Sequence, residues 1–316
     1  MSTSGPETLH KRRILCLHGG GVSAKIFRLQ ARSIIHALSP YFRLVFADGP
    51  FPSEMHPALI PVYSDMGPCY RWAGWLPDHI VTDGVDGDSA VKKIQESLHQ
   101  AMKSDPGTGE WVGLLGFSQG AKLAFSILLE DQQRQQEKGK PPLQDDGRFL
   151  GVNWKFGVLL AGRGPPYALS HRNLTRPHYD APGQTPAALS VESLAAALRL
   201  NPPGPESVLM TPTVHVHGLQ DEGLPFHRLL LKHFVDPASA QLVEWDGNHR
   251  VPIKTADVDA VTRALFSIVK VKEFLILRYC HSRVPFSHPL LGRSSYLNPQ
   301  PSRVDGQLHV PAAGQS

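Results

Sequence analysis

Residues 111–120 read WVGLLGFSQG, an apolar run that ends in a G-x-S-x-G motif centred on Ser118. Apolar residues then recur from Ala121 to Leu128 at the spacing of one helix face. A strand that turns sharply into a helix places the central serine on a strained corner. The glycines at Gly116 and Gly120 let neighbouring backbone come close there. The stretch therefore predicts a serine nucleophile, although an ordinary Gly-Ser turn that starts a helix would give the same five letters.

A second glycine-rich turn, His18-Gly19-Gly20-Gly21, follows the apolar residues 14–17. It has neither the Gly-Lys-Ser/Thr end of a P-loop nor the second Gly-x-x-Gly of a dinucleotide site, which argues against a dehydrogenase. Ahead of a G-x-S-x-G motif it fits one half of an oxyanion hole, with the backbone N–H groups of Gly20 and Gln119 as the donors. We interpret His18 as a structural residue, because hydrolases of this kind carry the catalytic base late in the chain.

Short apolar runs alternate with helical patterns along the chain. The predicted strands are residues 14–17, 41–48, 111–117, 154–162, 212–218 and 241–245. Such alternation predicts an α/β fold with a doubly wound, mostly parallel sheet and helices on both faces.

Composition divides the rest of the chain into ordered and irregular parts. We expect a disordered N-terminus at residues 1–11, a hydrolase domain at 12–278 with a surface insertion at 131–148, and a disordered tail at 279–316. Two irregular, proline-rich stretches, 51–78 and 163–206, are predicted to be cap-like loops over the active site.

The first of these loops is rich in aromatic residues. Phe51, Tyr70, Trp72 and Trp75 are candidates for lining an apolar substrate pocket. The alternative is that they form a satellite hydrophobic cluster.

Three turns at strand ends supply a catalytic set. Ser118, Asp221 and His249 occur in the order Ser, Asp, His that α/β-hydrolases use. We expect Ser118 to attack an acyl carbon, His249 to move the proton, and Asp221 to orient His249. Glu222 adjoins Asp221, but Asp221 comes first after its strand and is favoured.

Two further histidines, His215 and His217, alternate on a predicted strand and could hold a metal. No nearby carboxylate has a matching spacing, so packing is the favoured role.

The charge and the cysteine content of the chain indicate which partners and which cellular compartment to expect. The chain has 316 residues, a formal net charge of +4 and no single basic run, which does not suggest nucleic acid. Its cysteines, Cys16, Cys69 and Cys280, are an odd and widely spaced set that favours a reducing compartment. There is neither an apolar signal region nor a stretch long enough to span a bilayer. We expect a soluble cytoplasmic protein with no membrane partner.

Taken together, the motifs resemble the fungal serine hydrolases of the α/β-hydrolase superfamily, the group that contains the stand-alone esterases and thioesterases of polyketide clusters. The residues that carry the resemblance are Leu17-His18-Gly19-Gly20-Gly21 with Ile26, Phe27 and Gln30, Phe46-Ala47-Asp48-Gly49-Pro50-Phe51, Tyr70-Arg71-Trp72, Gly116-Phe117-Ser118-Gln119-Gly120-Ala121, Asp221 before Leu224-Pro225, and His249-Arg250-Val251-Pro252. It covers roughly residues 11 to 270. The chain departs from the family in having Gly247-Asn248 where paired glycines are frequent, and in its tail beyond about residue 278.

The resemblance implies that Ser118, Asp221 and His249 are the triad. Members near the lovastatin-type enzyme release a finished polyketide from its synthase by hydrolysing the thioester to the carrier-protein arm. We therefore expect a serine esterase or thioesterase that acts on an ester, or on a carrier-bound thioester, with an apolar acyl chain, with a polyketide synthase as partner and without metal or organic cofactor. The alternatives are a general short-chain carboxylesterase and a non-catalytic binding protein of the hydrolase fold. The intact set of Ser118, Asp221 and His249 argues against the latter.

Overall fold

The computed structural model describes residues 6–74, 87–136, 148–176, 178–183 and 190–269. Its main sheet has six strands in the order β2-β1-β5-β6-β7-β8, and all neighbouring pairs are parallel. The strands are β1 (Arg12–Leu17), β2 (Phe42–Ala47), β5 (Trp111–Phe117), β6 (Phe156–Leu160), β7 (Thr213–Gly218) and β8 (Ala240–Trp245). All six predicted strands are present.

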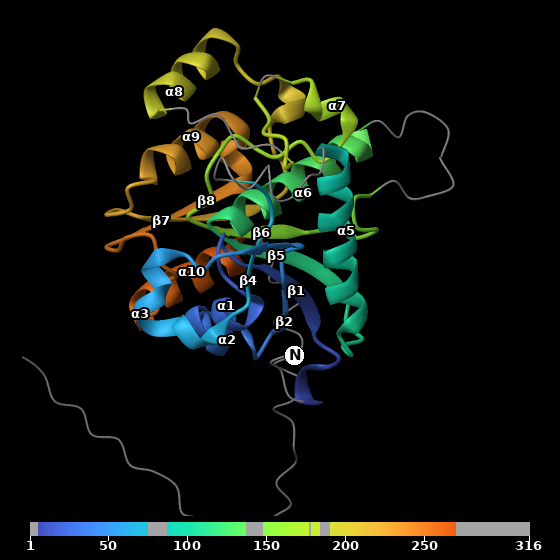
Figure 1. The fold of residues 1–316 in the computed structure, drawn as a ribbon, viewed down its shortest axis with the longest axis vertical. Coiled ribbons are helices and arrows are strands. Elements are labelled where there is room, and N and C mark those ends of the chain that lie inside the picture. The colour runs from blue at the N-terminus through green and yellow to red at the C-terminus, as the bar shows by residue number, and fades with distance from the viewer. Residues whose placement is uncertain (1–5, 75–86, 137–147, 177, 184–189, 270–316) are drawn as a thin grey trace, which may run out of the picture. The chain divides into compact units, whose positions relative to one another are not determined.

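Helices cover both faces of this sheet (Figure 1). On one face lie α1 (Ala24–Gln30), α2 (Arg32–Leu38) and α10 (Thr255–Ile268). On the other lie α5 (Gly87–Ser104), α6 (Gln119–Gln136) and α9 (Leu224–Phe234). Short helices α7 (His171–Leu174) and α8 (Val191–Leu200) belong to the segment after β6. The prediction of a doubly wound α/β-hydrolase fold is confirmed.

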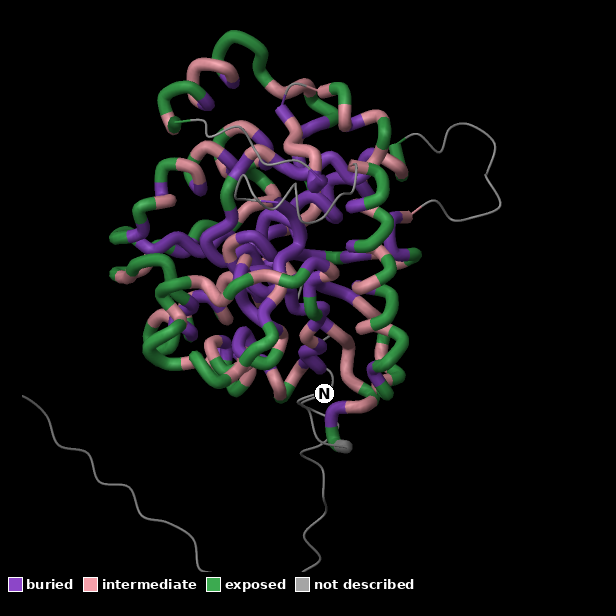
Figure 2. The backbone as a smooth tube through the Cα atoms, viewed as in Figure 1, coloured by how far each residue is buried: buried purple, intermediate pink, exposed green. Residues whose placement is uncertain are grey.

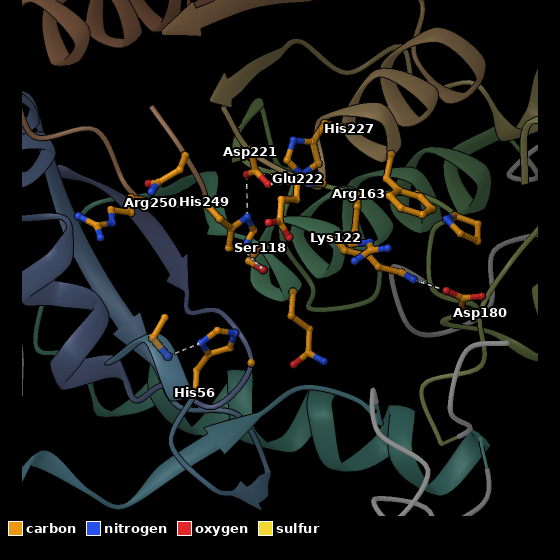
Figure 3. A pocket seen from close by; sticks show the side chains of 18 of the residues that line it. His56, Ser118, Lys122, Arg163, Asp180, Asp221, Glu222, His227, His249 and Arg250 are labelled. Atoms are coloured by element: carbon orange, nitrogen blue, oxygen red, sulfur yellow. Dashed lines mark hydrogen bonds and ion pairs between the residues drawn. The ribbon is translucent and has the colours of Figure 1, made fainter. Parts of the chain in front are cut away.

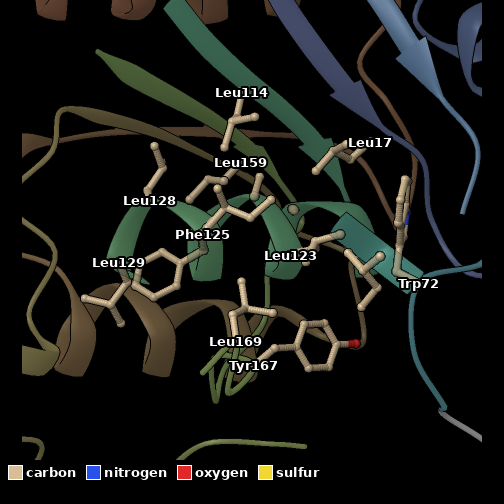
Figure 4. Packing of buried hydrophobic residues seen from close by; sticks show 14 of the residues in the cluster. Leu17, Trp72, Leu114, Leu123, Phe125, Leu128, Leu129, Leu159, Tyr167 and Leu169 are labelled. Carbon is tan, nitrogen blue, oxygen red and sulfur yellow. The ribbon is translucent and has the colours of Figure 1, made fainter. Parts of the chain in front are cut away.

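The core lies between the sheet and these helices. Figure 2 shows buried residues concentrated along the strands, with exposed residues on the outer sides of the helices. Helix α6 is buried over most of its length, and Leu123 and Phe125 pack with Leu114 and Leu159 of the strands beneath (Figure 4). This packing fixes the start of α6, the end that follows Ser118.

The predicted cap-like loop at residues 51–78 contains regular structure in its described part. Strands β3 (Phe51–Ser53) and β4 (Cys69–Arg71) form an antiparallel pair. Between them lie the 3-10 helices Pro57–Leu59 and Ser64–Met66 and the short helix α3 (Ile60–Tyr63). The sequence showed no period here because each element is only three or four residues long.

Two predicted boundaries need correction. Order begins before residue 12, because Pro6–Thr8 form a 3-10 helix and the Thr8 hydroxyl accepts a hydrogen bond from the Arg43 guanidinium. The predicted insertion at 131–148 overlaps α6, which continues to Gln136 because the buried Asp131 carboxylate accepts a hydrogen bond from the Phe149 backbone. The domain limits 12–278 and the tail at 279–316 stay predictions, since residues 270–316 lie outside the described residues.

None of the helices among the described residues combines the length and apolarity needed to cross a bilayer.

Candidate active site

Ser118 lies at the corner between β5 and α6. Its φ of 53° is in the left-handed region, which a non-glycine residue rarely adopts. A Cβ atom at Gly116 would overlap the Gly120 carbonyl oxygen, and one at Gly120 would overlap the Leu17 carbonyl oxygen. The strained corner and the close backbone approach expected from G-x-S-x-G are both present.

We predict that Gly120→Ala destabilises the protein by about 3 kcal/mol, because the added methyl group meets fixed backbone of β1 and cannot be relieved by a side-chain movement. The measurement is the free energy of unfolding from urea denaturation. Gly67→Ala is the matched control, since its φ is −65° and a Cβ there meets nothing within 4 Å. Equal stability of the two variants would contradict this account of the corner.

The three predicted triad residues meet at the carboxyl ends of β5, β7 and β8 (Figure 3). His249 Nε2 lies 2.9 Å from Ser118 Oγ, and His249 Nδ1 lies 2.7 Å from Asp221 Oδ2. With Nδ1–H donating to the carboxylate, Nε2 is left as the acceptor for the Ser118 hydroxyl. This is the arrangement of a nucleophile, a general base and the residue that orients the base.

The Asp221 carboxylate is held in a fixed orientation. Its side chain is 2% exposed, and Oδ1 accepts a hydrogen bond of 2.8 Å from the Gly223 backbone N–H. Burial raises the pKa of Asp221, but the hydrogen bonds from His249 and Gly223 and the charge of His249 outweigh it, so the pKa lies below its ordinary value. The carboxylate therefore stays ionised beside the imidazole. Glu222 is exposed and makes no hydrogen bond to His249 among the described residues.

Two backbone N–H groups are placed to stabilise an oxyanion. Gln119 is the first residue of α6, an 18-residue helix whose N-terminus carries partial positive charge. In the described part of the chain, no acceptor is bonded to the backbone N–H of Gln119 or of Gly20, and both residues line the cavity at Ser118. The Gln119 side chain is used elsewhere: its Oε1 accepts from the Trp72 backbone at 2.7 Å and its Nε2 donates to the Ala73 carbonyl oxygen at 3.1 Å.

His18 is structural, as expected. Its ring is buried, Nδ1 lies 2.7 Å from the Gly19 carbonyl oxygen, and Nε2 accepts a hydrogen bond from the Gly49 backbone at 2.9 Å. Burial lowers its pKa to about 4, so the ring is neutral and joins the turns that follow β1 and β2.

The aromatic candidates for substrate binding are placed differently from the prediction. Phe51 and Trp72 are 3% and 0% exposed and belong to the hydrophobic core, and the Trp72 indole N–H donates to the His18 carbonyl oxygen at 2.8 Å. Tyr70 pairs through its backbone with Val22 and does not line the cavity. Trp75 lies outside the described residues. For Phe51 and Trp72 the alternative of a hydrophobic cluster is the better description, because both side chains pack into the core.

A cavity of about 890 Å³ opens at Ser118. The segment 51–78 contributes His56, Ala58 and Gly74 to its lining, and apolar side chains come from Tyr167, Leu194 and Phe226. Polar and charged side chains make up much of the remainder: Lys122, Arg163, Asp180, Gln220, Glu222, Asn248 and Arg250.

Sequence reasoning missed Lys122, Asp180 and Arg163. Lys122 carries a usable signal, since a charged residue interrupts the apolar run that begins at Ala121. The sequence around Asp180 and around Arg163 gives no such signal, because only the fold brings these two parts of the chain close to the start of α6.

A group of buried histidines lies beneath Asp221. His215 and His217 of β7 are buried, as the packing interpretation expects, and burial lowers their pKa values to about 3 and 4. His227 of α9 was not predicted; its Nε2 lies 4.0 Å from Asp221 Oδ2, and burial lowers its pKa to about 3. The ligand atoms of Asp221, His227 and His249 are close enough to hold a metal ion. However, the 2.7 Å contact between Asp221 and His249 has the geometry of a hydrogen bond.

Comparison with known proteins identifies the family and its esterase relatives. The profile of the family described as "Serine hydrolase (FSH1)" matches residues 7–261. The chain is 47% identical to Esterase pigG of Monascus ruber over 264 residues, which cover 82% of this chain and 92% of the relative. It is 43% identical to Esterase claE of Penicillium crustosum over 267 residues, 84% of this chain and 95% of the relative. Among solved structures, that of esterase PE8 aligns with a TM-score of 0.45 at 14% identity, over 85% of this chain and 97% of the other.

Proposed function

The chain belongs to the FSH1 family of serine hydrolases, and from this premise we propose that Ser118, His249 and Asp221 hydrolyse an ester or thioester through an acyl-serine intermediate. The observation that carries the proposal is the pair of hydrogen bonds that joins Ser118 to His249 and His249 to Asp221, three residues that line one cavity. The predictions of the family and of a serine esterase are confirmed by the family match and by the esterase relatives.

In the first half-reaction, Ser118 Oγ attacks the acyl carbon while His249 Nε2 takes the hydroxyl proton. The carbonyl oxygen becomes an oxyanion that the N–H groups of Gly20 and Gln119 stabilise, and each such donor contributes about 3 kcal/mol to the transition state. His249 then gives its proton to the leaving alcohol or thiol, and the acyl group stays on Ser118.

Water completes the reaction by the same route. His249 Nε2 takes a proton from a water molecule as its oxygen attacks the acyl-serine, and the collapse of the second oxyanion returns the proton to Ser118. Asp221 stays ionised throughout and stabilises the imidazolium.

The substrate we propose is an acyl chain with a substantial apolar part, joined to a small alcohol or to the thiol of a carrier-protein arm. Tyr167, Leu194 and Phe226 supply apolar surface within a cavity that is large for a short acyl group. By resemblance to polyketide-cluster esterases, the biological role is to release or process a polyketide, with a polyketide synthase as the partner. A general short-chain carboxylesterase is the second candidate, supported by the ester chemistry alone.

The test compares the hydrolysis of medium-chain acyl thioesters on a purified acyl carrier protein with that of p-nitrophenyl acetate. The proposal expects a higher kcat/KM for the carrier-bound thioesters. A kcat/KM that is highest for the acetate and falls as the acyl chain lengthens would favour the general carboxylesterase instead.

We also propose a cytoplasmic location, which rests on the odd and sparse cysteines. Of the described cysteines, Cys16 and Cys69 are both free and buried.

A further inference from the structure

Two cationic side chains lie on the cavity wall that begins at Ser118. Lys122 is one helical turn beyond the nucleophile, since its backbone N–H donates to the Ser118 carbonyl oxygen at 3.1 Å. Arg163 follows β6, the strand next to β5, and Figure 3 shows both side chains on the same side of Ser118. Burial lowers the pKa of Lys122, the Asp180 carboxylate opposes this change, and the positive charge of Arg163 adds to it. The cavity wall beside the nucleophile therefore carries two cationic side chains, together with the carboxylates of Asp180 and Glu222.

The charge of Lys122 is balanced within the protein. Its ammonium forms an ion pair with Asp180 and lies 4.3 Å from the ring centre of Tyr167. A buried cation needs a partner of opposite charge, so we interpret the Lys122–Asp180 pair as a structural part of the cavity wall. The two charges compensate each other and are not available to a ligand.

The charge of Arg163 is not balanced in this way. Its guanidinium lies over the ring of Phe226, 4.2 Å from the centroid, and no carboxylate among the described residues pairs with it. Stacking on a ring fixes the plane of a guanidinium but leaves its N–H edge able to donate. Arg163 is exposed and lines the cavity, so that edge is accessible to a bound molecule.

The backbone that carries Arg163 is constrained. Ala161, two residues earlier, has a φ of 51° and, with Ser118, is one of the two non-glycine residues of positive φ in the described segments. Its N–H donates to the Val216 carbonyl oxygen at 2.9 Å, which ties the turn to β7. Arg163 therefore stands on a fixed turn beside the nucleophile corner.

We propose that Arg163 binds an anionic oxygen on the acyl group of the substrate, a carboxylate or an ionised enol, and so makes the enzyme selective for acidic acyl chains. The inference rests on the proposed function and adds the chemical class of the acyl group. A guanidinium is planar and can donate two parallel N–H hydrogen bonds to such oxygens.

The position of Arg163 favours the acyl chain over the carrier arm as the source of the anion. Arg163 lies on the same cavity wall as Lys122, which is one helical turn from Ser118. The phosphate of a pantetheine arm, in contrast, is separated from the thioester sulfur by many bonds. An anion held here belongs to the part of the substrate near the scissile carbonyl.

The test uses p-nitrophenyl monoesters of adipic, suberic and sebacic acids, each paired with the neutral ester of equal chain length: hexanoate, octanoate and decanoate. In the wild-type enzyme, kcat/KM is expected to be higher for the acidic member of at least one pair. Arg163→Met should lower kcat/KM for that acidic ester by roughly 10- to 100-fold, with a smaller change for its neutral partner. Arg163→Glu should reverse the preference. Arg228→Met, which removes an exposed arginine of α9 that pairs with Glu244 outside the cavity, is the matched control and should leave the ratio unchanged.

The same acyl groups on N-acetylcysteamine and on coenzyme A distinguish the two sources of the anion. A loss in Arg163→Met that follows the acyl carboxylate on both thiols supports the proposal, and a loss that follows the phosphates of coenzyme A regardless of the acyl group overturns it. Equal losses for acidic and neutral esters would also overturn it, because they indicate a structural role. If the wild-type enzyme hydrolyses none of the esters, the proposed function fails, and that result is distinct from hydrolysis without selectivity.

Discussion

Ser118→Ala is expected to abolish hydrolysis, with kcat reduced by roughly 10⁶-fold, while the protein stays folded. The Oγ atom is the only group at this corner that can form the covalent bond to the acyl carbon, and its hydrogen bond in the described structure is to His249 at 2.9 Å. The fold does not depend on that contact, because the corner is fixed by the close approach of Gly116 and Gly120 to neighbouring backbone. The measurement is ester hydrolysis, together with circular dichroism and the urea midpoint of each variant.

Ser64→Ala is the control, since Ser64 is exposed and does not line the cavity. Retention of more than about one-hundredth of the wild-type kcat by folded Ser118→Ala would contradict the assignment of the nucleophile, because loss of a single oxyanion donor alone costs that much.

Asp221→Asn is expected to lower kcat by about 10⁴-fold with little change in structure. The Gly223 backbone N–H donates to Asp221 Oδ1, so the amide oxygen of an asparagine would take that position and its NH₂ group would face His249 Nδ1. An NH₂ group donates, and it would hold His249 as the tautomer protonated on Nε2. That nitrogen could then no longer accept the Ser118 proton.

Glu222→Gln tests the alternative carboxylate. We expect a much smaller loss, because Glu222 is exposed and forms no hydrogen bond or ion pair with His249 in the described structure. A loss in Glu222→Gln as large as that in Asp221→Asn would show that the orientation of His249 depends on both carboxylates.

The three proposed catalytic residues could be predicted from the sequence because a local motif and the order of the strands along the chain determine their positions. The G-x-S-x-G corner predicted Ser118 because few residues tolerate that turn, and the structure shows the strain as a φ of 53°. Asp221 and His249 were found from their positions after successive strands, since the carboxyl ends of neighbouring parallel strands meet at one edge of the sheet.

The lining of the cavity could not be found in this way. Aromatic residues in an irregular segment are equally suited to a pocket and to a core, and Phe51 and Trp72 pack into the core. Arg163 and Asp180 reach the cavity from the segment after β6, whose path over the sheet leaves no periodic trace in the sequence. The charged side chains on the cavity wall are thus a property of the fold, and the proposed role of Arg163 adds an acidic group to the apolar acyl chain expected from the sequence.

The most direct test of the central claim is labelling with a fluorophosphonate followed by peptide mapping, on the wild-type protein and on Ser118→Ala. An activated serine attacks the phosphorus and keeps the adduct, so we expect one modified peptide, with the label on Ser118, and none in the variant. Folded wild-type protein that takes no label, or takes it at another residue, would contradict an assembled triad and would make the non-catalytic binding protein the better description.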